Sequence, residues 1–442
     1  MNSLRRSATI PRPLPGTPPV PVVPAPSRFT LENGLRVVAL ARSDLPQVAA
    51  RLVLPAGSAV DPADAPGTAC LVGSLLTEGT QELSAIELNE RIDNLGASLG
   101  ARASHDFAEV DLRLLAETLE EGLDLLASVV VTPSFPSREV ERLRAESLDA
   151  LEARLDEPAN IADDHVDEAV FGPGHPYGRL PIGTLDGVRR LRRDTMVEFH
   201  RARYRPEGSV LVIVGDFDVD RMRRRLESAF QGWAGLADRI EYPSIPSELN
   251  SPERSVFVES EESGQSELRI AGLGLPRSSP DWIPAAVANY ILGGSTITGR
   301  LGANLREDKG WTYGVRSGFS AGVHPGGWVV ETAVGAEVTA RALDEIEAEL
   351  RRMVEEPISE EELARASEAL ILSLPRAFET PGRTVSRLAT VEAYGLDPDY
   401  WERFPQRVHQ VTVDDVARIA AECFAPERLV RVTVGPRSPV GS

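Results

Sequence analysis

The chain has 442 residues, 42% of them hydrophobic and 26% charged, which is typical of a folded protein with two or more domains. Its formal net charge of −20 argues against a nucleic-acid-binding protein, because such proteins neutralise phosphates with a basic surface. No apolar run approaches the ~20 residues of a membrane-spanning helix, and two cysteines exclude a disulfide framework, so we expect a cytoplasmic protein.

The chain begins with a proline-rich segment, residues 1–27, that contains the sequence SATIPRPLPGTPPVPVVPAP. This composition is too rich in proline and too weakly apolar for the core of a signal peptide. It predicts a flexible leader with extended, polyproline-like conformations.

The segment Gly67–Thr80, GTACLVGSLLTEGT, predicts a helix in which small residues flank an apolar run. Cys70, Gly73 and Ser74 lie where one face of this helix would carry functional groups. No charged residue near Cys70 in the sequence would lower the pKa of its thiol, so we expect a buried and inert cysteine.

None of the six histidines forms a pair at the spacing of a helical zinc motif. His165 begins the nearest approach, HVDEA, but Ala169 stands where the second histidine would be. We therefore expect His165 to lie on an exposed helix face, and His175 to have a structural role in the loop GPGHPYGR. The same exposed face would carry Asp163, Asp164 and Asp167.

The segment Asn289–Phe319, NYILGGSTITGRLGANLREDKGWTYGVRSGF, has the features of a binding site. Its glycine pair ends one helix, Ser295 or Thr296 begins the next, and Lys309 followed by Gly310 ends that helix.

In this arrangement Arg306 lies in the last turn of the second helix and Tyr313 just beyond the turn, so the two side chains can converge. Together they can donate hydrogen bonds to a peptide carbonyl or a developing oxyanion. From the residues alone, a solvated arginine and a half-buried strand tyrosine are the favoured alternative.

An internal repeat organises the chain. DTMVEFHRARYRPEGSVLVIVGD from Asp194 resembles DDVARIAAECFAPERLVRVTVGP from Asp414, 220 positions later and without gaps. Each copy predicts an amphipathic helix, a Pro-Glu turn and a β-branched strand. A second pair, FPSREVERLRAESL from Phe135 and ISEEELARASEALI from Ile358, predicts two helix starts.

The repeat predicts two copies of one α+β unit, residues 28–235 and 254–438, that face each other across a cleft. The Pro/Ser-rich residues 236–253 between them predict a linker.

Several long motifs resemble, in order, landmarks of the M16 family of zinc peptidases, which includes pitrilysin, insulinase and mitochondrial processing peptidase. They are FTLENGLRVVAL, LVLPAGSAVDP, FGPGHPYGRLPIGT, FHRARYRPEGSVLVIVGD and LREDKGWTYGVRSGF. The resemblance covers nearly the whole chain after the leader and is closest to the short bacterial two-chain (M16B-type) members. It implies two homologous domains, each a mainly antiparallel sheet packed with helices, which together form one half of a clam-shaped pair.

The resemblance identifies Gly67–Thr80 as the family's zinc helix, where active members carry His-x-x-Glu-His. In this chain those three positions hold Cys70, Gly73 and Ser74. The third family ligand, a glutamate on a later helix, corresponds to Ala150, or to Leu151 if the spacing differs by one. We therefore expect no catalytic zinc in this chain.

The resemblance also assigns Arg306 and Tyr313 to the family's pair that reaches across the chamber to hold the substrate carbonyl. It implies a non-catalytic subunit that encloses a peptide chamber with a partner carrying zinc and His-x-x-Glu-His. A structural or peptide-binding scaffold without a role in proteolysis is the alternative. A self-sufficient hydrolase that uses Cys70 is a weaker third hypothesis.

Overall fold

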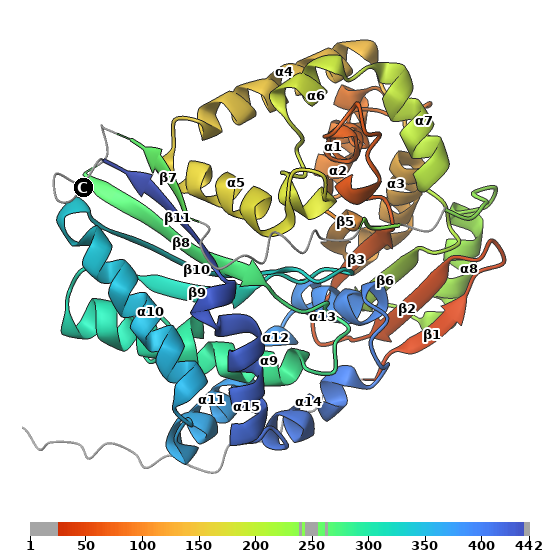
Figure 1. Ribbon diagram of the computed structural model, residues 1–442. Coiled ribbons are helices and arrows are strands. Elements are labelled where there is room, and N and C mark those ends of the chain that lie inside the picture. The colour runs from red at the N-terminus through yellow and green to blue at the C-terminus, as the bar shows by residue number, and fades with distance from the viewer. Residues whose placement is uncertain (1–24, 238–240, 244–254, 261–263, 437–442) are drawn as a thin grey trace, which may run out of the picture.

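The structure is a computed structural model that describes residues 25–237, 241–243, 255–260 and 264–436. These residues form two mixed β-sheets, each packed with helices, in two halves that lie side by side (Figure 1). The predicted α+β class is confirmed. Most of the predicted leader 1–27 and of the predicted linker 236–253 lies outside the described residues.

The first sheet has six strands in the order β1-β2-β6-β3-β5-β4. Its strands are β1 (Ser27–Thr30), β2 (Arg36–Ala41), β3 (Gln47–Leu54), β4 (Ser98–Ala103), β5 (Ala108–Leu115) and β6 (Val210–Gly215). β2 and β6 run parallel, and the other neighbouring pairs are antiparallel. Every residue of β6 is buried, which makes this strand the centre of the first half.

The second sheet has five strands in the order β7-β11-β8-β10-β9. Its strands are β7 (Ser255–Glu259), β8 (Gln265–Leu273), β9 (Val315–Phe319), β10 (Gly327–Gly335) and β11 (Val430–Gly435). β11 runs parallel to β7 and antiparallel to β8, as β6 does with β2 and β3. The sequence repeat therefore corresponds to a repeated sheet topology.

The helix that precedes each repeated strand is present as predicted. These helices are α7 (Arg193–Arg203) in the first copy and α15 (Val413–Ile419), continued by the π-helix Ala420–Phe424, in the second. In the second predicted pair, Ser359 forms a capping box with Glu362 at the start of α11 (Glu360–Leu372). Its counterpart α4 (Ser137–Arg154) begins after Pro136 without a side-chain cap.

The remaining helices cover the two sheets (Figure 1). In the first half they are α1 (Thr68–Leu75), α2 (Ala85–Asn94), α3 (Leu119–Val131), α5 (Pro158–Phe171), α6 (Leu185–Arg190) and α8 (Val219–Ala229). In the second half they are α9 (Trp282–Asn289), the π-helices Tyr290–Gly294 and Gly302–Asp308, α10 (Thr339–Glu355), α12 (Leu374–Ala377), α13 (Pro381–Ala393) and α14 (Tyr400–His409). Among the described residues, no helix combines the length and apolar character needed to cross a membrane.

The two halves exchange one helix each. α5, from the first half, packs on β8 and β11 of the second sheet, and Val166 and Val170 are buried there (Figure 1). α13, from the second half, packs on β3 and β6 of the first sheet, with Val385 and Leu388 buried. A sheet whose central strand is buried needs cover on both faces, and the exchanged helix supplies the cover that the sheet's own half does not.

An ion pair also links α5 to the second sheet. Arg269 of β8 is only 5% exposed, and its Nε lies 2.7 Å from the carboxylate of Asp163 on α5. A second carboxylate, that of Glu267, lies 2.9 Å from its Nη1. Because a buried charge is tolerated only when it is paired, the position of α5 beside β8 satisfies the Arg269 guanidinium.

Candidate functional site

Helix α1 begins at a tightly packed turn. Gly67, its N-cap residue, has a φ of 99°, and a Cβ atom there would lie 2.4 Å from the carbonyl oxygen of Ile182. The carboxylate of Asp61 accepts hydrogen bonds from the backbone N–H groups of Gly67 at 2.7 Å and Ala69 at 2.8 Å. Burial raises the pKa of Asp61 to about 7 in spite of these bonds. Packing and capping therefore fix the start of α1.

The four predicted positions of the degenerate zinc site lie on α1 and α4, which contact each other. Cys70 is half-buried, and its thiol donates to the carbonyl oxygen of Ala103 at 3.5 Å. Gly73 is buried against the backbone of β4, whereas Ser74 and Ala150 are exposed.

These residues do not fit a catalytic zinc ion. Burial, followed by the negative charge of Asp61, raises the pKa of Cys70 to about 12, so the thiol stays protonated at neutral pH. Gly73 and Ala150 have no ligand atom in their side chains, and a serine hydroxyl is not among the usual zinc ligands. In the part of the chain that the structure describes, no group of three or more His, Cys, Asp or Glu residues could hold a metal ion. The protonated thiol also argues against Cys70 as a nucleophile.

The predicted exposed face around His165 is only partly exposed, because α5 packs on the second sheet. Asp163 is exposed, but Asp164, His165 and Asp167 are half-buried. Burial, followed by the charges of Asp163 and Asp164, raises the pKa of Asp167 to about 7. The expectation of an exposed face was therefore wrong for Asp164, His165 and Asp167, which are half-buried.

His175 has the structural role expected of its loop. It is 2% exposed, and its Nδ1 accepts a hydrogen bond from the backbone N–H of Tyr177 at 3.1 Å. Its ring centroid lies 5.1 Å from that of His324 in the other half. Burial, followed by the charge of His324, lowers the pKa of His175 to about 4, so the ring is neutral at pH 7.

A buried carboxylate beside these rings joins the two halves. Asp106 is 3% exposed and accepts hydrogen bonds from the hydroxyl of Tyr177 at 2.6 Å and from the hydroxyl of Tyr242. It also accepts one from the backbone N–H of Val323 in the second half, at 2.9 Å. Asp106 thereby ties Tyr177 and Tyr242 to the second half, while Nε2 of His175 and Nδ1 of His324 are buried without a hydrogen-bond partner among the described residues.

Arg306 and Tyr313 lie close together on the second half. Arg306 is in the last turn of the π-helix Gly302–Asp308, and Tyr313 follows the turn that leads into β9. The guanidinium carbon of Arg306 lies 5.8 Å from the centroid of the Tyr313 ring. Tyr313 is 94% exposed, and the ion pair of Arg306 with its neighbour Glu307 is long, at 3.7 Å. Both side chains can therefore donate hydrogen bonds to a ligand from outside this chain.

Contacts on both sides hold the turn between the two residues. The Trp311 ring lies between two cations, 5.6 Å from Lys309 Nζ and 5.1 Å from the guanidinium carbon of Arg341. The backbone N–H of Trp311 donates a hydrogen bond to the carbonyl oxygen of Leu305 at 2.9 Å. The Thr312 hydroxyl donates one to the carbonyl oxygen of Gly314 at 2.9 Å. The exposed pair is therefore carried by an ordered turn.

The C-terminal end of the helix that carries Arg306 agrees with the sequence-based expectation, but its N-terminal end does not. Leu301 is the N-cap residue and makes no side-chain cap hydrogen bond. The side chain of Ser295 instead accepts a hydrogen bond from the backbone N–H of Thr298 at 3.2 Å, in a turn before the helix begins. Lys309 is its C-cap residue, and Gly310 follows with a φ of 64°.

Two buried charged residues escaped the sequence analysis. Asp106 and Arg277 each stand alone in an unremarkable stretch of sequence, SHDF and LPRSSP. The partners of Asp106, and Tyr400 beside Arg277, come from distant segments, so no local spacing could have identified the burial of either residue.

Comparisons with known proteins agree with this architecture. The family model for insulinase (peptidase family M16) matches residues 36–179, and the model for the peptidase M16 inactive domain matches residues 190–370. An uncharacterised zinc protease of Streptomyces coelicolor is 24% identical over 412 residues, which cover 92% of this chain and 89% of that protein. One from Mycobacterium tuberculosis is 27% identical over 420 residues, 93% of each chain. A crystal structure of a peptidase M16 inactive domain from Pseudomonas fluorescens is similar with a TM-score of 0.86 and 26% identity, over 93% of this chain and 98% of that one.

Proposed function

Because the chain belongs to the M16 peptidase family and lacks the zinc-binding residues of its active members, we propose that it is the zinc-less subunit of a two-chain M16-type endopeptidase. Its partner carries the zinc ion and the motif His-x-x-Glu-His. This chain encloses the peptide chamber together with that partner and supplies Arg306 and Tyr313 to the active site.

The observation that carries this proposal is the exposure of Tyr313. A tyrosine ring usually gains stability by burial, yet Tyr313 is 94% exposed beside the guanidinium of Arg306. Such a ring contributes little to the stability of this chain. Its place on an ordered turn is explained by a ligand that arrives with the partner.

The chemistry of the pair is donation of hydrogen bonds. The Tyr313 hydroxyl and the Arg306 guanidinium can bind the oxygen of a scissile peptide carbonyl, and their bonds strengthen as negative charge develops on that oxygen. A fixed arrangement of donors favours the transition state because it needs no reorganisation during the reaction. The packing of Trp311 and the hydrogen bonds of Thr312 provide this arrangement.

Reconstitution tests the proposal. A gene next to the one for this chain is expected to encode a chain of similar size with His-x-x-Glu-His and without the Arg/Tyr pair. The two chains are co-expressed, the complex is purified, and zinc content and peptide cleavage are measured for the complex and for each chain alone. We expect the complex to contain zinc and to cleave unfolded peptides, and this chain alone to do neither.

Two results would contradict the proposal. If the zinc-bearing chain is fully active without this chain, the Arg/Tyr pair is not needed for catalysis. If no such partner exists, the alternative of a structural or peptide-binding scaffold replaces the enzyme role.

A further inference from the structure

A buried guanidinium without an acidic partner lies between the two halves. Arg277, between β8 and α9, is 5% exposed, and its Nη1 has no hydrogen-bond partner among the described residues. Its guanidinium carbon lies 4.9 Å from the ring centroid of Trp282 and 4.9 Å from that of Tyr400. These rings attract the cation but do not accept its N–H groups in the ring plane, and an unsatisfied buried donor is costly. Arg277 therefore lacks an anion.

A cavity of about 570 Å³ lies beside Arg277. Its aromatic walls come from both halves and are formed by Phe107, Trp282, Tyr394, Tyr400, Trp401 and Phe404. A volume of this size, with aromatic walls and several polar groups, suits a small ligand or the end of a chain.

The charges that line this cavity are not balanced. Arg387 also lines it and, like Arg277, forms no ion pair with any other described residue. Burial, followed by the charge of Arg277, lowers the pKa of Arg387, as expected for two cations that share a site. The carboxylate in the lining, Glu109, is already bound by Arg51 at 3.4 Å and by Arg102. The cavity therefore offers positive charge to an incoming anion.

A groove lined by arginines continues from the cavity. The two share Ser373, Ala377, Ser386 and Arg387. The charged residues that line the groove are Arg113, Arg376, Arg383 and Arg387. Among them, Arg383 has an acidic partner, Glu379 at 3.2 Å. On a chain with a net charge of −20, such a concentration of arginine favours an acidic ligand.

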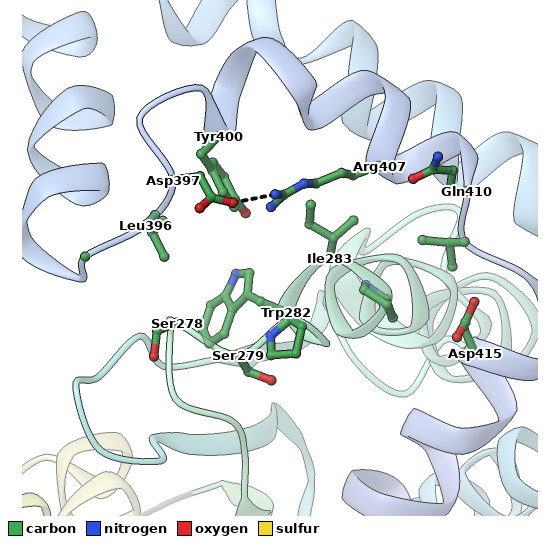
Figure 2. A pocket seen from close by; sticks show the side chains of 14 residues that line it. Ser278, Ser279, Trp282, Ile283, Leu396, Asp397, Tyr400, Arg407, Gln410 and Asp415 are labelled. Atoms are coloured by element: carbon green, nitrogen blue, oxygen red, sulfur yellow. Dashed lines mark hydrogen bonds and ion pairs between the residues drawn. The ribbon is translucent and has the colours of Figure 1, made fainter.

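A second hollow, of about 420 Å³, lies on another side of Trp282 and Tyr400 and differs in charge (Figure 2). Its lining arginine, Arg407, lies 2.6 Å from the carboxylate of Asp397, and Asp415 also lines the hollow. Of these hollows around Trp282 and Tyr400, the one beside Arg277 and its groove is therefore the one lined by arginines without acidic partners among the described residues.

We propose that the cavity and the groove bind the C-terminal end of an acidic peptide. The apolar last residue enters the aromatic cavity, Arg277 and Arg387 receive its carboxylate, and preceding acidic side chains lie along the arginine groove. The carboxylate supplies the acceptor that Arg277 lacks, and the further arginines of the adjoining groove favour a chain with several acidic groups over a free organic acid. The proposal does not depend on a catalytic partner, since binding is measured on this chain alone.

Calorimetric titration of the full chain tests this proposal with three probes. The first is an N-acetylated pentapeptide of three glutamates, a leucine and a C-terminal phenylalanine. The second is the same peptide with a C-terminal amide, and the third is 3-phenylpropanoate, which has the same acid and ring without the chain. We expect the first to bind, the amide to bind at least about 10-fold more weakly, and 3-phenylpropanoate to bind more weakly than the first peptide. Equal affinities for the two peptides, or for the peptide and the free acid, would overturn the proposal, as would the absence of binding by the first peptide.

Substitutions separate binding from stability. Arg277→Met keeps the length and the apolar contacts of the side chain and removes its charge, so we expect at least a 10-fold loss of affinity with no fall in Tm. Arg387→Met, at the more exposed end of the cavity, is the second variant and is expected to weaken binding without affecting folding. Arg403→Met, on an exposed arginine of α14 paired with Asp399 at 2.7 Å, is the matched control. Unchanged affinity in both cavity variants would show that the arginines do not hold the peptide.

Discussion

Helix α1 and the turn that carries Arg306 and Tyr313 differ in what they bury and in what they expose. α1 has no side chains that fit a zinc ion, but it is fixed by the Gly67 turn, by Asp61 and by its contact with β4. The turn near Tyr313 presents Arg306 beside an exposed ring that contributes little to packing. The comparison teaches that a helix in the core is held by its packing, whereas polar side chains on an ordered surface turn are available to a ligand.

The largest expected effect tests the packing role of α1. Gly67→Ala places a Cβ 2.4 Å from a backbone oxygen at a residue with a φ of 99°, a conformation that alanine disfavours. We expect the free energy of unfolding to fall by about 3 kcal/mol, measured by urea denaturation. A loss below about 1 kcal/mol would mean that the turn can relax and does not fix α1.

The next effect tests the chemical role of the Arg306 turn. In the reconstituted complex, Tyr313→Phe and Arg306→Ala each remove one donor to the developing oxyanion, and we expect kcat to fall by about 10²-fold. The stability of this chain should change by less than about 0.5 kcal/mol, because Tyr313 is exposed and the half-buried Arg306 has only a long ion pair with Glu307.

Arg316→Ala is the control for those variants, since Arg316 is an exposed arginine on the adjacent strand β9 that pairs with Glu331 at 2.8 Å. It should leave kcat unchanged. If the Tyr313 and Arg306 variants both keep full activity, the turn that carries these residues has no role in catalysis.

The next effect is a dependence of stability on pH. It tests the contact between the two halves at His175, whose ring lies beside that of His324. The folded-state pKa of His175 is lowered to about 4, below the usual value of about 6.5, so the unfolded chain binds a proton first as the pH falls. Stability is therefore lost as the pH falls below 6.5, and we expect a loss of about 2 kcal/mol from this residue between pH 6.5 and 5.

The measurement for His175 compares urea denaturation of the wild type and of His175→Gln across this range. The variant loses the titrating ring, so the difference in stability between the two proteins should shrink as the pH falls. A difference that stays constant would show that His175 titrates normally in the folded chain.

The smallest effect concerns Gly73 on α1. A Cβ at Gly73 would lie 3.4 Å from the nearest backbone atom of Arg102, which is ordinary contact. Gly73→Ala should therefore raise the free energy of unfolding by about 0.5–1 kcal/mol, because alanine favours the helix interior. A loss of stability would show that packing requires glycine at this position.

Much of the architecture could be predicted because it depends on local or repeated patterns. The copies that begin at Asp194 and Asp414 produce the equivalent strands β6 and β11, and the apolar periodicity of each copy defines the preceding helix. The end of the helix at Lys309 and Gly310 could also be predicted, because backbone preferences at a helix end depend on the residues at that end. The prediction that Arg306 and Tyr313 form a binding pair also needed the family resemblance, because the residues alone favoured a solvated arginine and a half-buried tyrosine.

By itself, the sequence determined the class of fold and the repeated topology, because each is a property of residue order. Only the tertiary structure decided that α5 and α13 cover each other's sheets, that Asp106 joins the halves and that Arg277 is buried without an anion. The physical reason is that burial and pairing depend on which distant segments meet. A carboxylate or a guanidinium has the same local sequence whether its partner is water, a tyrosine from the other half or a ligand.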